Sequence, residues 1–360
     1  MINPSKFIMD LKPYDPTTQD IWSSVSSKRL LKLDWNEAPE ELKWHKDSLE
    51  KIITEKGIIA WYPDCLAIEL TESLSKKISI SPNYILTFPG SDVALETLCK
   101  CYFNYDDNVL VLSPTYENFF VYVNSVGAKL DYFLFDDVST ERIDQLKNYI
   151  SNHHNLKAIY ITRPNNPLGY VISYSDIEDL CALFPKVIFI IDEAYIEFAN
   201  DVSCVNLVNN HNNIVVTRTF SKAYGMAGLR IGYIVGSLHI INTLNKIRNG
   251  KNLSMISQRM ACFALENYHQ VQLWIDQVIE ARNYFQNWCD TNNIEYFQSN
   301  GNFVTFFVKN PIKLCSDLKA EGILIRNRNK VLSGYVRATM GSKNHIEKLI
   351  SSLKQTLEID

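Results

Sequence analysis

The sequence lacks both a secretion signal and an apolar run long enough to cross a bilayer. Its first ten residues, MINPSKFIMD, contain neither a basic leader nor an apolar core, the two features that mark a signal peptide. A spanning helix needs about 20 predominantly apolar residues in succession, and no stretch of the chain approaches that length. We therefore expect a cytoplasmic protein without a membrane partner.

Metal-ligand spacing is absent as well. The chain has seven histidines and eight cysteines, but none of them form the H-x-x-x-H or C-x-x-C patterns of zinc sites. The cysteines mostly lie among apolar residues of a long chain without a secretion signal, which is typical of reduced, buried thiols. We expect neither a metal site nor a disulfide framework.

The sequence has no strongly basic region. Its formal net charge is -4, which gives no electrostatic reason to expect nucleic acid or an anionic membrane as a partner. The short run Arg326, Arg328 and Lys330 is interleaved with asparagines. Two interpretations of this run remain open, a local anion site and a solvated turn.

The chain is long enough for two domains. With 360 residues and 46% hydrophobic content, it exceeds the size at which a single core usually stops growing. The apolar strand at residues 108–112 is typical of a parallel sheet that is buried on both faces, and residues 237–290 show helical spacing. Short strands at residues 302–308, 322–326 and 334–339 then indicate a smaller α/β domain.

The most distinctive stretch, residues 219–233, reads TFSKAYGMAGLRIGY. A lysine attacks a carbonyl group only as the neutral amine, so Lys222 needs a setting that lowers its proton affinity. Thr219, Ser221 and Arg230 flank it, and hydroxyl groups with an arginine fork match the oxygens of a phosphate. The stretch therefore predicts a cradle for pyridoxal 5'-phosphate, with Lys222 bound to the aldehyde of this cofactor.

Two further candidates for cofactor binding precede the lysine stretch. Gly90, Ser91 and Asp92 form a predicted turn at a helix start, with Ser91 as the N-cap, and free N–H groups at a helix start bind phosphate. Tyr116 follows the strand at residues 108–112, at the sheet edge where ligands of parallel sheets bind. A tyrosine in this position can also pack over the start of a helix, and both interpretations can hold together.

Two more candidates follow predicted strands. Asn166 lies in a loop, residues 163–169, that two prolines and a glycine fix tightly. Asp192 ends the apolar strand at residues 187–191, and Tyr195 comes three residues later. A buried aspartate beside a pyridine nitrogen keeps that nitrogen protonated, which makes the ring a better electron sink. The alternatives for Asp192 are a strand-end cap and a metal carboxylate.

These motifs, in this order from Tyr14 to Arg337, resemble the class I and II aminotransferases of fold type I, and most of all the histidinol-phosphate aminotransferase family. The resemblance implies an α/β fold whose large domain has a mostly parallel sheet between helices. It places an N-terminal arm at residues 1–40, packing with the small domain. The cofactor-binding domain would then cover residues 41–240, and the small α/β domain residues 241–360.

The resemblance also assigns roles to single residues. Lys222, Asp192 and Tyr195 would be catalytic, and the chain would form a homodimer in which Tyr62 reaches the cofactor phosphate of the other subunit. The substrate and its anionic group would be bound by Tyr14, Asn36, Arg326 and Arg337. The cofactor would be bound by Gly90, Ser91, Asp92, Tyr116, Asn166, Asp192, Tyr195, Thr219, Ser221, Lys222 and Arg230, together with Tyr62.

The activity implied is transfer of an amino group between a small phosphorylated amine or amino acid, with histidinol phosphate as the first candidate, and a 2-oxo acid such as 2-oxoglutarate. Three residues depart from the family pattern, Trp35, Arg163 in place of asparagine and Leu168 in place of threonine. They leave room for a shorter substrate such as an amino alcohol phosphate or phosphoserine. The alternative activity is pyridoxal-phosphate-dependent decarboxylation of a phosphorylated amino acid of the phosphoserine or phosphothreonine type.

Overall fold

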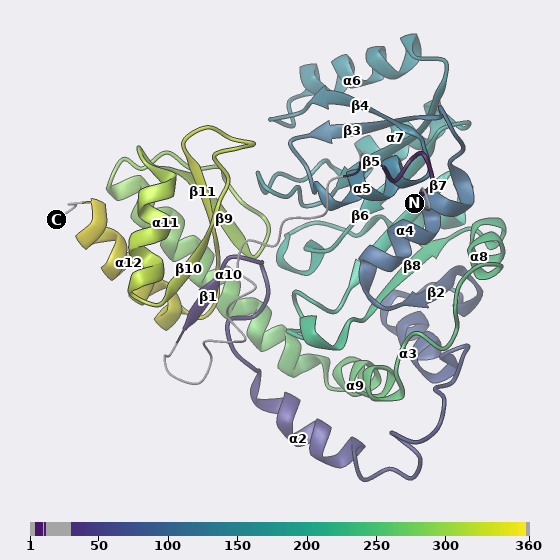
Figure 1. The fold of residues 1–360 in the computed structure, drawn as a ribbon, viewed down its shortest axis with the longest axis horizontal. Coiled ribbons are helices and arrows are strands. Elements are labelled where there is room, and N and C mark those ends of the chain that lie inside the picture. The colour runs from purple at the N-terminus through teal and green to yellow at the C-terminus, as the bar shows by residue number, and fades with distance from the viewer. Residues whose placement is uncertain (1–3, 10, 12–29, 358–360) are drawn as a thin grey trace.

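A computed structural model describes residues 4–9, 11 and 30–357 of the chain. Figure 1 shows two regions, each built around its own sheet, with the helix α10 (Tyr268–Thr291) running between them. No helix in this described part of the chain is both long and apolar enough to span a membrane. All eight cysteines lie in it, and all are free thiols.

The larger sheet has seven strands and is mostly parallel, as predicted. In sheet order they are β2 (Ile85–Phe88), β8 (Gly232–Gly236), β7 (Ile214–Thr219), β6 (Ile188–Asp192), β5 (Leu156–Thr162), β3 (Asn108–Ser113) and β4 (Lys129–Leu134). The five strands from β7 to β4 run parallel to one another. Only β8 is antiparallel, to both β2 and β7.

Helices cover both faces of this sheet. Successive side chains of a strand point to opposite faces, so Val109 and Val111 of β3 join one core cluster whereas Leu110 and Leu112 join the other. Burial on both faces explains why these strands are apolar throughout. The first face is covered by α4 (Gly90–Tyr102), α5 (Asn118–Ser125) and α8 (Leu238–Asn245). The second is covered by α3 (Ile68–Ile78), α6 (Thr140–Asn152) and α7 (Tyr174–Leu183).

The smaller sheet combines one strand from the start of the chain with three from its end. Its order is β1 (Leu31–Leu33), β10 (Ile323–Asn327), β11 (Tyr335–Thr339) and β9 (Phe303–Phe307). β1 runs parallel to β10, and the other pairs are antiparallel, which places Arg326 directly opposite Arg337. Two helices complete this region: α11 (Pro311–Ala320) packs on β10, and α12 (Lys343–Leu357) packs on α10 and α11.

The described residues among the first forty contact both regions. β1 belongs to the smaller sheet, but the ring of Phe7 stacks on Tyr105 in the larger region, with 5.4 Å between the ring centroids. Phe7 also lies against Gly127, which precedes β4. The N-terminal segment therefore connects the two regions of the molecule.

The helical region expected at residues 237–290 contains three separate helices, α8, α9 (Met255–Glu266) and α10. A serine starts α9, since the side chain of Ser254 accepts a hydrogen bond from the backbone N–H of Ser257 at 3.1 Å, as N-cap residues do. The remaining elements are α2 (Lys43–Ile52) and the short 3-10 helices η1 (Pro82–Tyr84), η2 (Ile196–Phe198), η3 (Cys204–Asn209) and η4 (Ala227–Leu229).

Candidate functional site

The candidate residues meet at the edge of the larger sheet where its parallel strands end. Tyr116 follows β3, Asn166 follows β5, Asp192 is the last residue of β6 and Lys222 follows β7. The carboxyl ends of parallel strands lie side by side at one edge of a sheet, which is where ligands bind in such folds. The sheet topology thus brings together residues that are up to 106 positions apart, from Tyr116 to Lys222.

Lys222 is partly buried and lies beside the segment that follows β1. Its Nζ donates a hydrogen bond to the backbone oxygen of Trp35 at 2.8 Å and lies 5.9 Å from the centre of the Tyr195 ring. Burial lowers the pKa of Lys222 to about 8, and the positive charge of Arg337 acts in the same direction against the opposing effect of Glu37. A substantial fraction of this amine is therefore neutral near physiological pH, as a nucleophilic lysine requires.

Asp192 is 4% exposed and has one partnered and one unpartnered oxygen. The hydroxyl of Tyr160 donates a hydrogen bond to Oδ2 at 2.7 Å, whereas Oδ1 is buried without a hydrogen-bond partner. Burial raises the pKa of Asp192 to about 6, although the Tyr160 hydrogen bond opposes this change. A buried carboxylate oxygen without a partner suits a cationic N–H donor from a bound ring.

The Tyr195 hydroxyl lies between two amide side chains. Asn36 Nδ2 donates to it at 3.1 Å and Asn166 Nδ2 at 3.3 Å. Burial raises the pKa of Tyr195, while Arg337 and the Asn36 hydrogen bond act in the opposite direction. Asn36 has a backbone φ of 56° and is 1% exposed, so the smaller region presents this amide in a conformation that asparagine tolerates better than most residues. The structure thus brings Asn36, Asn166 and Tyr195 together.

The predicted phosphate cradle is assembled at the start of α4. The prediction that Ser91 caps this helix is wrong, because α4 begins one residue earlier, at Gly90. Gly90 has a φ of +84°, and a Cβ on it would lie 2.6 Å from Arg230 Nη2. Glycine therefore suits this backbone angle, and it lets the Arg230 guanidinium lie close to the start of α4. The first N–H groups of α4, including that of Ser91, remain available to an anion.

Hydroxyl groups and a carboxylate surround the Arg230 guanidinium. Arg230 Nη1 donates to Ser221 Oγ at 3.4 Å, and Thr219 Oγ1 donates to the same oxygen at 3.0 Å. Arg230 Nη2 forms an ion pair of 3.1 Å with Asp92 Oδ2, and the other oxygen of Asp92 accepts a hydrogen bond from the Tyr116 hydroxyl at 2.9 Å. Asp92 therefore fixes the tyrosine and the arginine relative to each other.

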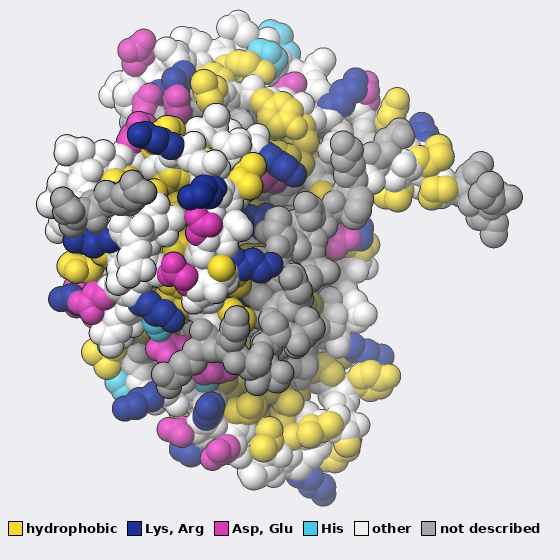
Figure 2. All heavy atoms as spheres, turned by 60° about the vertical axis from the view of Figure 1, so that its left-hand side comes forward, with side chains coloured by type: hydrophobic (Ala, Val, Ile, Leu, Met, Phe, Trp, Pro, Cys, Tyr) yellow, Lys and Arg dark blue, Asp and Glu magenta, His cyan; other side chains and the backbone are white. Residues whose placement is uncertain are grey.

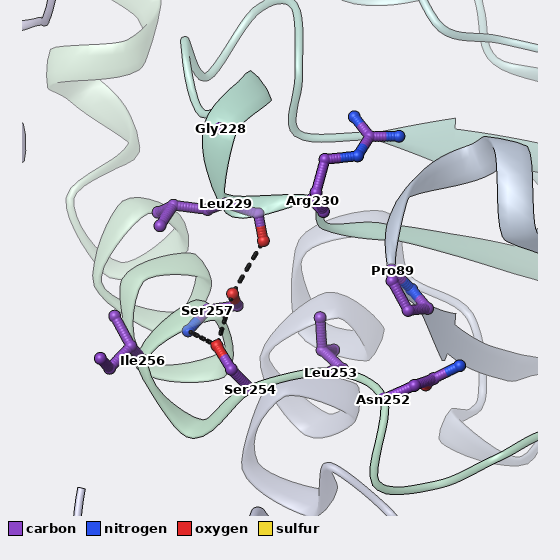
Figure 3. A pocket seen from close by; sticks show the side chains of 9 residues that line it. All are labelled: Pro89, Gly228, Leu229, Arg230, Asn252, Leu253, Ser254, Ile256 and Ser257. Atoms are coloured by element: carbon purple, nitrogen blue, oxygen red, sulfur yellow. Dashed lines mark hydrogen bonds between the residues drawn. The ribbon is translucent and has the colours of Figure 1, made fainter. Parts of the chain in front are cut away.

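A pocket of about 300 Å³ opens beside Arg230. Figure 3 shows its walls, with the Arg230 side chain pointing away from Ser254 and Ser257 at the start of α9. The hydroxyl of Ser257 donates to the backbone oxygen of Leu229 at 2.8 Å, which ties α9 to the turn before Arg230. The pocket thus lies between the turn before Arg230 and the start of α9.

The two arginines predicted to bind the substrate lie on the smaller sheet, and Arg337 contacts the residues of the site. Arg337 Nη1 donates to Asn166 Oδ1 at 2.5 Å, and Nη2 donates to the backbone oxygen of Asp34 at 3.0 Å. Burial lowers the pKa of Arg337 to about 10, and the charges of Arg328 and Arg326 contribute in the same direction. Arg326 is the register partner of Arg337, so both side chains project from the same face of the sheet.

One predicted residue, Tyr62, is not brought to this site within one chain. Tyr62 is 79% exposed, and its ring lies 4.6 Å from the Lys251 ammonium. Tyr14 lies outside the residues that the structure describes. All the other predicted cofactor and substrate residues belong to the cluster described above.

The departures at Arg163 and Leu168, which we expected to bear on the substrate, are explained by internal packing. Arg163 is fully buried, and its guanidinium pairs with Glu193 at 3.2 Å and with Asp201 at 2.9 Å. Its Nε also donates to the backbone oxygen of Ile172 at 2.7 Å. Leu168 is 2% exposed and belongs to the main core cluster. Both side chains are committed to contacts inside the protein.

Sequence reasoning missed the contact of Tyr160 with Asp192, and it placed Arg328 only in a run interpreted as a local anion site or a solvated turn. Tyr160 contacts Asp192 from the neighbouring strand, and a single tyrosine in the apolar strand β5 was the available signal. Arg328 is 8% exposed and pairs with Glu117 through Nη1 and Oε2 at 3.1 Å. Its sequence signal was its place in the basic run with Arg326 and Lys330.

Three comparisons with known proteins agree with this geometry. A family model described as aminotransferase class I and II matches residues 28–353. A dihydroxyacetone phosphate transaminase of Campylobacter jejuni is 34% identical over 357 residues, which cover 98% of this chain and 96% of that relative. A histidinol-phosphate aminotransferase of Bacteroides fragilis is 29% identical, with coverage of 97% and 96%.

Among solved structures, the chain is similar to a histidinol-phosphate aminotransferase from Sinorhizobium meliloti in complex with pyridoxal-5'-phosphate. The TM-score is 0.87 at 20% identity, and the match covers 99% of this chain and 98% of that chain. An aspartate aminotransferase variant from Thermus thermophilus matches with a TM-score of 0.80 at 19% identity, covering 99% and 100%. The likeness to these structures extends over both sheets.

Proposed function

Because the chain belongs to the class I and II aminotransferase family of pyridoxal-phosphate-dependent transaminases, we propose that it moves an amino group between a small phosphorylated amine or amino acid and a 2-oxo acid. The expected fold type I architecture is confirmed by the structural matches. The single observation that carries the proposed substrate class is the pairing of Arg326 with Arg337 beside Asn166.

The residues present fit pyridoxal phosphate at two points. Asp192 Oδ1 is buried without a partner and is free to accept from a protonated ring nitrogen. The start of α4, with Ser221 and Arg230, offers donors to a phosphate where Gly90 leaves no room for a side chain. When bound, the cofactor supplies an electron sink that stabilises negative charge on the substrate carbon.

Each catalytic residue then has a separate task. Lys222, with a pKa of about 8, takes a proton from the substrate carbon and returns one, as general base and general acid. Asp192 would hold positive charge on the ring nitrogen of the bound cofactor, since a carboxylate favours the protonated form of a nearby base. Tyr195 and Asn166 would hold the phenolic side of the ring by hydrogen bonds, and Tyr116 would pack against the ring.

The substrate binds through its anionic group on the smaller sheet. Arg326 and Arg337 project from one face of that sheet, and guanidinium groups bind phosphate and carboxylate oxygens by parallel hydrogen bonds. The whole-length relatives named above act on phosphorylated compounds by their descriptions. We propose two donors of the amino group, histidinol phosphate and the amino alcohol phosphate that corresponds to dihydroxyacetone phosphate. Glutamate and 2-oxoglutarate form the second pair of substrates.

We propose that two copies of the chain form a homodimer with shared sites. Exposed apolar side chains gather between the end of α2 and the start of α3, where Ile59 is 79% exposed and Trp61 63% exposed. Figure 2 shows hydrophobic side chains at the lower end of the molecule, the end at which α2 lies in Figure 1. A partner that covers this surface removes an apolar patch from water. Tyr62 lies in the same patch, and the pocket beside Arg230 offers room for it on the partner.

A half-reaction screen tests the proposed function. The cofactor-loaded protein is mixed with histidinol phosphate, amino alcohol phosphates, phosphoserine or glutamate, while the absorbance of the cofactor and the release of carbon dioxide are followed. Transamination converts the cofactor to its amine form without carbon dioxide. Carbon dioxide release from a phosphorylated amino acid without that conversion supports decarboxylation instead and contradicts the proposal.

The same screen tests the arginines. Loss of a hydrogen bond to a charged group costs about 1.5–3 kcal/mol, so Arg326→Ala should reduce catalytic efficiency roughly tenfold to a hundredfold for phosphorylated amines. Unphosphorylated amines should react poorly with both proteins. An equal effect of Arg326→Ala on phosphorylated and unphosphorylated amines would contradict phosphate recognition by this residue.

A further inference from the structure

A third arginine projects from the face that carries Arg326 and Arg337. The backbone N–H of Arg328 donates to the Tyr335 oxygen at 3.0 Å, so the antiparallel pairing of Arg326 with Arg337 continues for two more residues. Residues two apart in a strand share a face, which places the Arg328 side chain beside those of Arg326 and Arg337. The positive charge of Arg328 lowers the pKa of Arg337 more than that of Arg326 does.

The buried guanidinium of Arg328 is only partly satisfied. Its Nη1 forms an ion pair of 3.1 Å with Glu117, a residue that is itself 45% exposed at its side chain. Its Nε is buried without a hydrogen-bond partner. Leaving a buried donor on a charged group without a partner costs free energy, so this N–H is a strong candidate for contact with a ligand.

Arg337 has the same deficiency. Its Nε is also buried without a partner, and its two hydrogen bonds go to the neutral oxygens of Asn166 and the Asp34 backbone. The Asp34 carboxylate pairs with Lys32 at 2.9 Å. Two neighbouring buried arginines therefore each keep one donor unpaired, and an anion with several oxygens and more than one negative charge matches both of them.

We propose that Arg328 is a specificity-determining residue that binds the phosphate group of the substrate together with Arg337, and that it selects doubly charged phosphate monoesters over carboxylates. The ion pair with Glu117 holds the Arg328 guanidinium at the site. A phosphate monoester carries nearly two negative charges at pH 7 and three acceptor oxygens, whereas a carboxylate has one charge and two oxygens. This inference rests on the proposed function, because it concerns the anionic group of the same substrate.

Binding measurements on the cofactor-loaded protein separate this role from catalysis. Glycerol 3-phosphate serves as a phosphate monoester without an amine, and glutarate as a carboxylate ligand, with both affinities measured by calorimetry. We expect Arg328→Gln to weaken glycerol 3-phosphate about tenfold or more, the usual effect of losing a charged hydrogen bond. Glutarate affinity should change less than about twofold. For a phosphorylated amine, KM should rise with kcat nearly unchanged, since the contact is already made in the bound substrate.

Two further variants keep the test decisive. Arg328→Lys retains the charge and should bind glycerol 3-phosphate with an intermediate affinity, because a lysine lacks the fork. Arg142→Gln removes an arginine that is also ion-paired, with Asp136 at 2.8 Å, but lies on α6 away from the site, and should change neither affinity. Thermal unfolding of each variant shows that it is folded.

Equal weakening of both ligands by Arg328→Gln, or no weakening of either, would overturn the role of Arg328. Failure of the wild-type protein to bind glycerol 3-phosphate would overturn it as well. The proposed function fails on a different result, the absence of amino transfer from any phosphorylated amine in the wild-type protein. The two ideas can therefore be contradicted independently.

Discussion

The hydroxyl of Tyr160 donates a hydrogen bond to Oδ2 of Asp192 at 2.7 Å, while Oδ1 of the same carboxylate is buried without a partner. Tyr160 lies on β5 and Asp192 on β6, next to each other in the sheet. The sheet thus holds a carboxylate in a fixed orientation with one oxygen available to a ligand. Burial keeps its pKa at about 6, so its negative charge is costly until a cation binds.

Replacing Asp192 should therefore stabilise the cofactor-free protein and reduce the stability that the bound cofactor adds. A carboxyl group with a raised folded-state pKa makes the protein less stable as pH rises from about 4 to about 6, by about 3 kcal/mol in all. At pH 8 the cofactor-free Asp192→Asn variant should be more stable than the wild type in urea unfolding. Bound cofactor should stabilise the wild type more than it stabilises Asp192→Asn, because only the carboxylate pairs with a cationic nitrogen.

The matched control for this experiment is Tyr160→Phe, which removes the hydrogen bond and keeps the carboxylate. Bound cofactor should still stabilise Tyr160→Phe more than Asp192→Asn. A variant Asp192→Asn that gains as much stability from the cofactor as the wild type would contradict pairing of Asp192 with the ring nitrogen.

Lys222 should capture the cofactor with a pH dependence that reports its lowered pKa. The neutral amine is the reactive form, and the pKa of Lys222 is about 8. The rate of covalent attachment to the cofactor-free protein should therefore rise with pH and level off above about 9, whereas an ordinary lysine continues to rise past about 10. Stopped-flow absorbance measures the rate.

Borohydride reduction and peptide mapping identify the lysine that has reacted. The label should lie on Lys222, and Lys222→Ala should take up none. A label on another lysine of the wild-type protein would remove the basis for the proposed mechanism.

The buried ion pair of Arg163 and Glu193 should matter for stability far more than a surface pair. Removing one partner of a buried pair typically costs about 3–5 kcal/mol, because the other charge stays buried. We expect Arg163→Gln to lower the free energy of unfolding by about 3 kcal/mol. The surface control Arg142→Gln should lower it by less than about 1 kcal/mol.

A double variant separates the charge from the packing. Adding Glu193→Gln to Arg163→Gln removes the charge that is left without its partner, so part of the lost stability should return. Additive losses from the two substitutions would show that the ion pair itself contributes little.

Mixing two defective chains tests the shared site. Tyr62→Phe and Lys222→Ala should each have low activity as pure dimers, but a hybrid of the two contains one site with both intact residues. Random mixing in a twofold dimer gives about a quarter of the wild-type number of intact sites. If both variants dimerise and exchange subunits without any gain of activity, Tyr62 does not act across the interface.

The site residues that the sequence predicted are those whose chemistry is visible in a local pattern. Asp192 ends an apolar strand, Tyr116 comes three residues after another, and residues 219–233 carry Lys222 with its hydroxyl and arginine neighbours. In a parallel sheet, a residue that follows a strand is placed at the ligand-binding edge by the topology alone. The mostly parallel sheet and the positions of most of the candidate cofactor residues could therefore be predicted from the sequence.

What the sequence did not reveal depends on contacts between distant segments. Tyr160 binds Asp192 across 32 positions and Arg328 binds Glu117 across 211, and no local pattern reports either distance. Arg163 looked like a substrate residue because it departs from a motif. Its burial and its ion pair with Glu193 depend on the tertiary packing. The close approach of Arg230 to Gly90 at the start of α4 also joins segments that are far apart in the sequence.

Transfer of labelled nitrogen tests the central claim most directly. The cofactor-loaded protein is incubated with 2-oxoglutarate and a 15N-labelled phosphorylated amine, histidinol phosphate or the amino alcohol phosphate of dihydroxyacetone phosphate, and glutamate is analysed by mass spectrometry. The account predicts 15N-labelled glutamate from at least one phosphorylated donor, much less from its unphosphorylated counterpart, and none with Lys222→Ala. Unlabelled glutamate throughout, or equal labelling from phosphorylated and unphosphorylated donors, would contradict it.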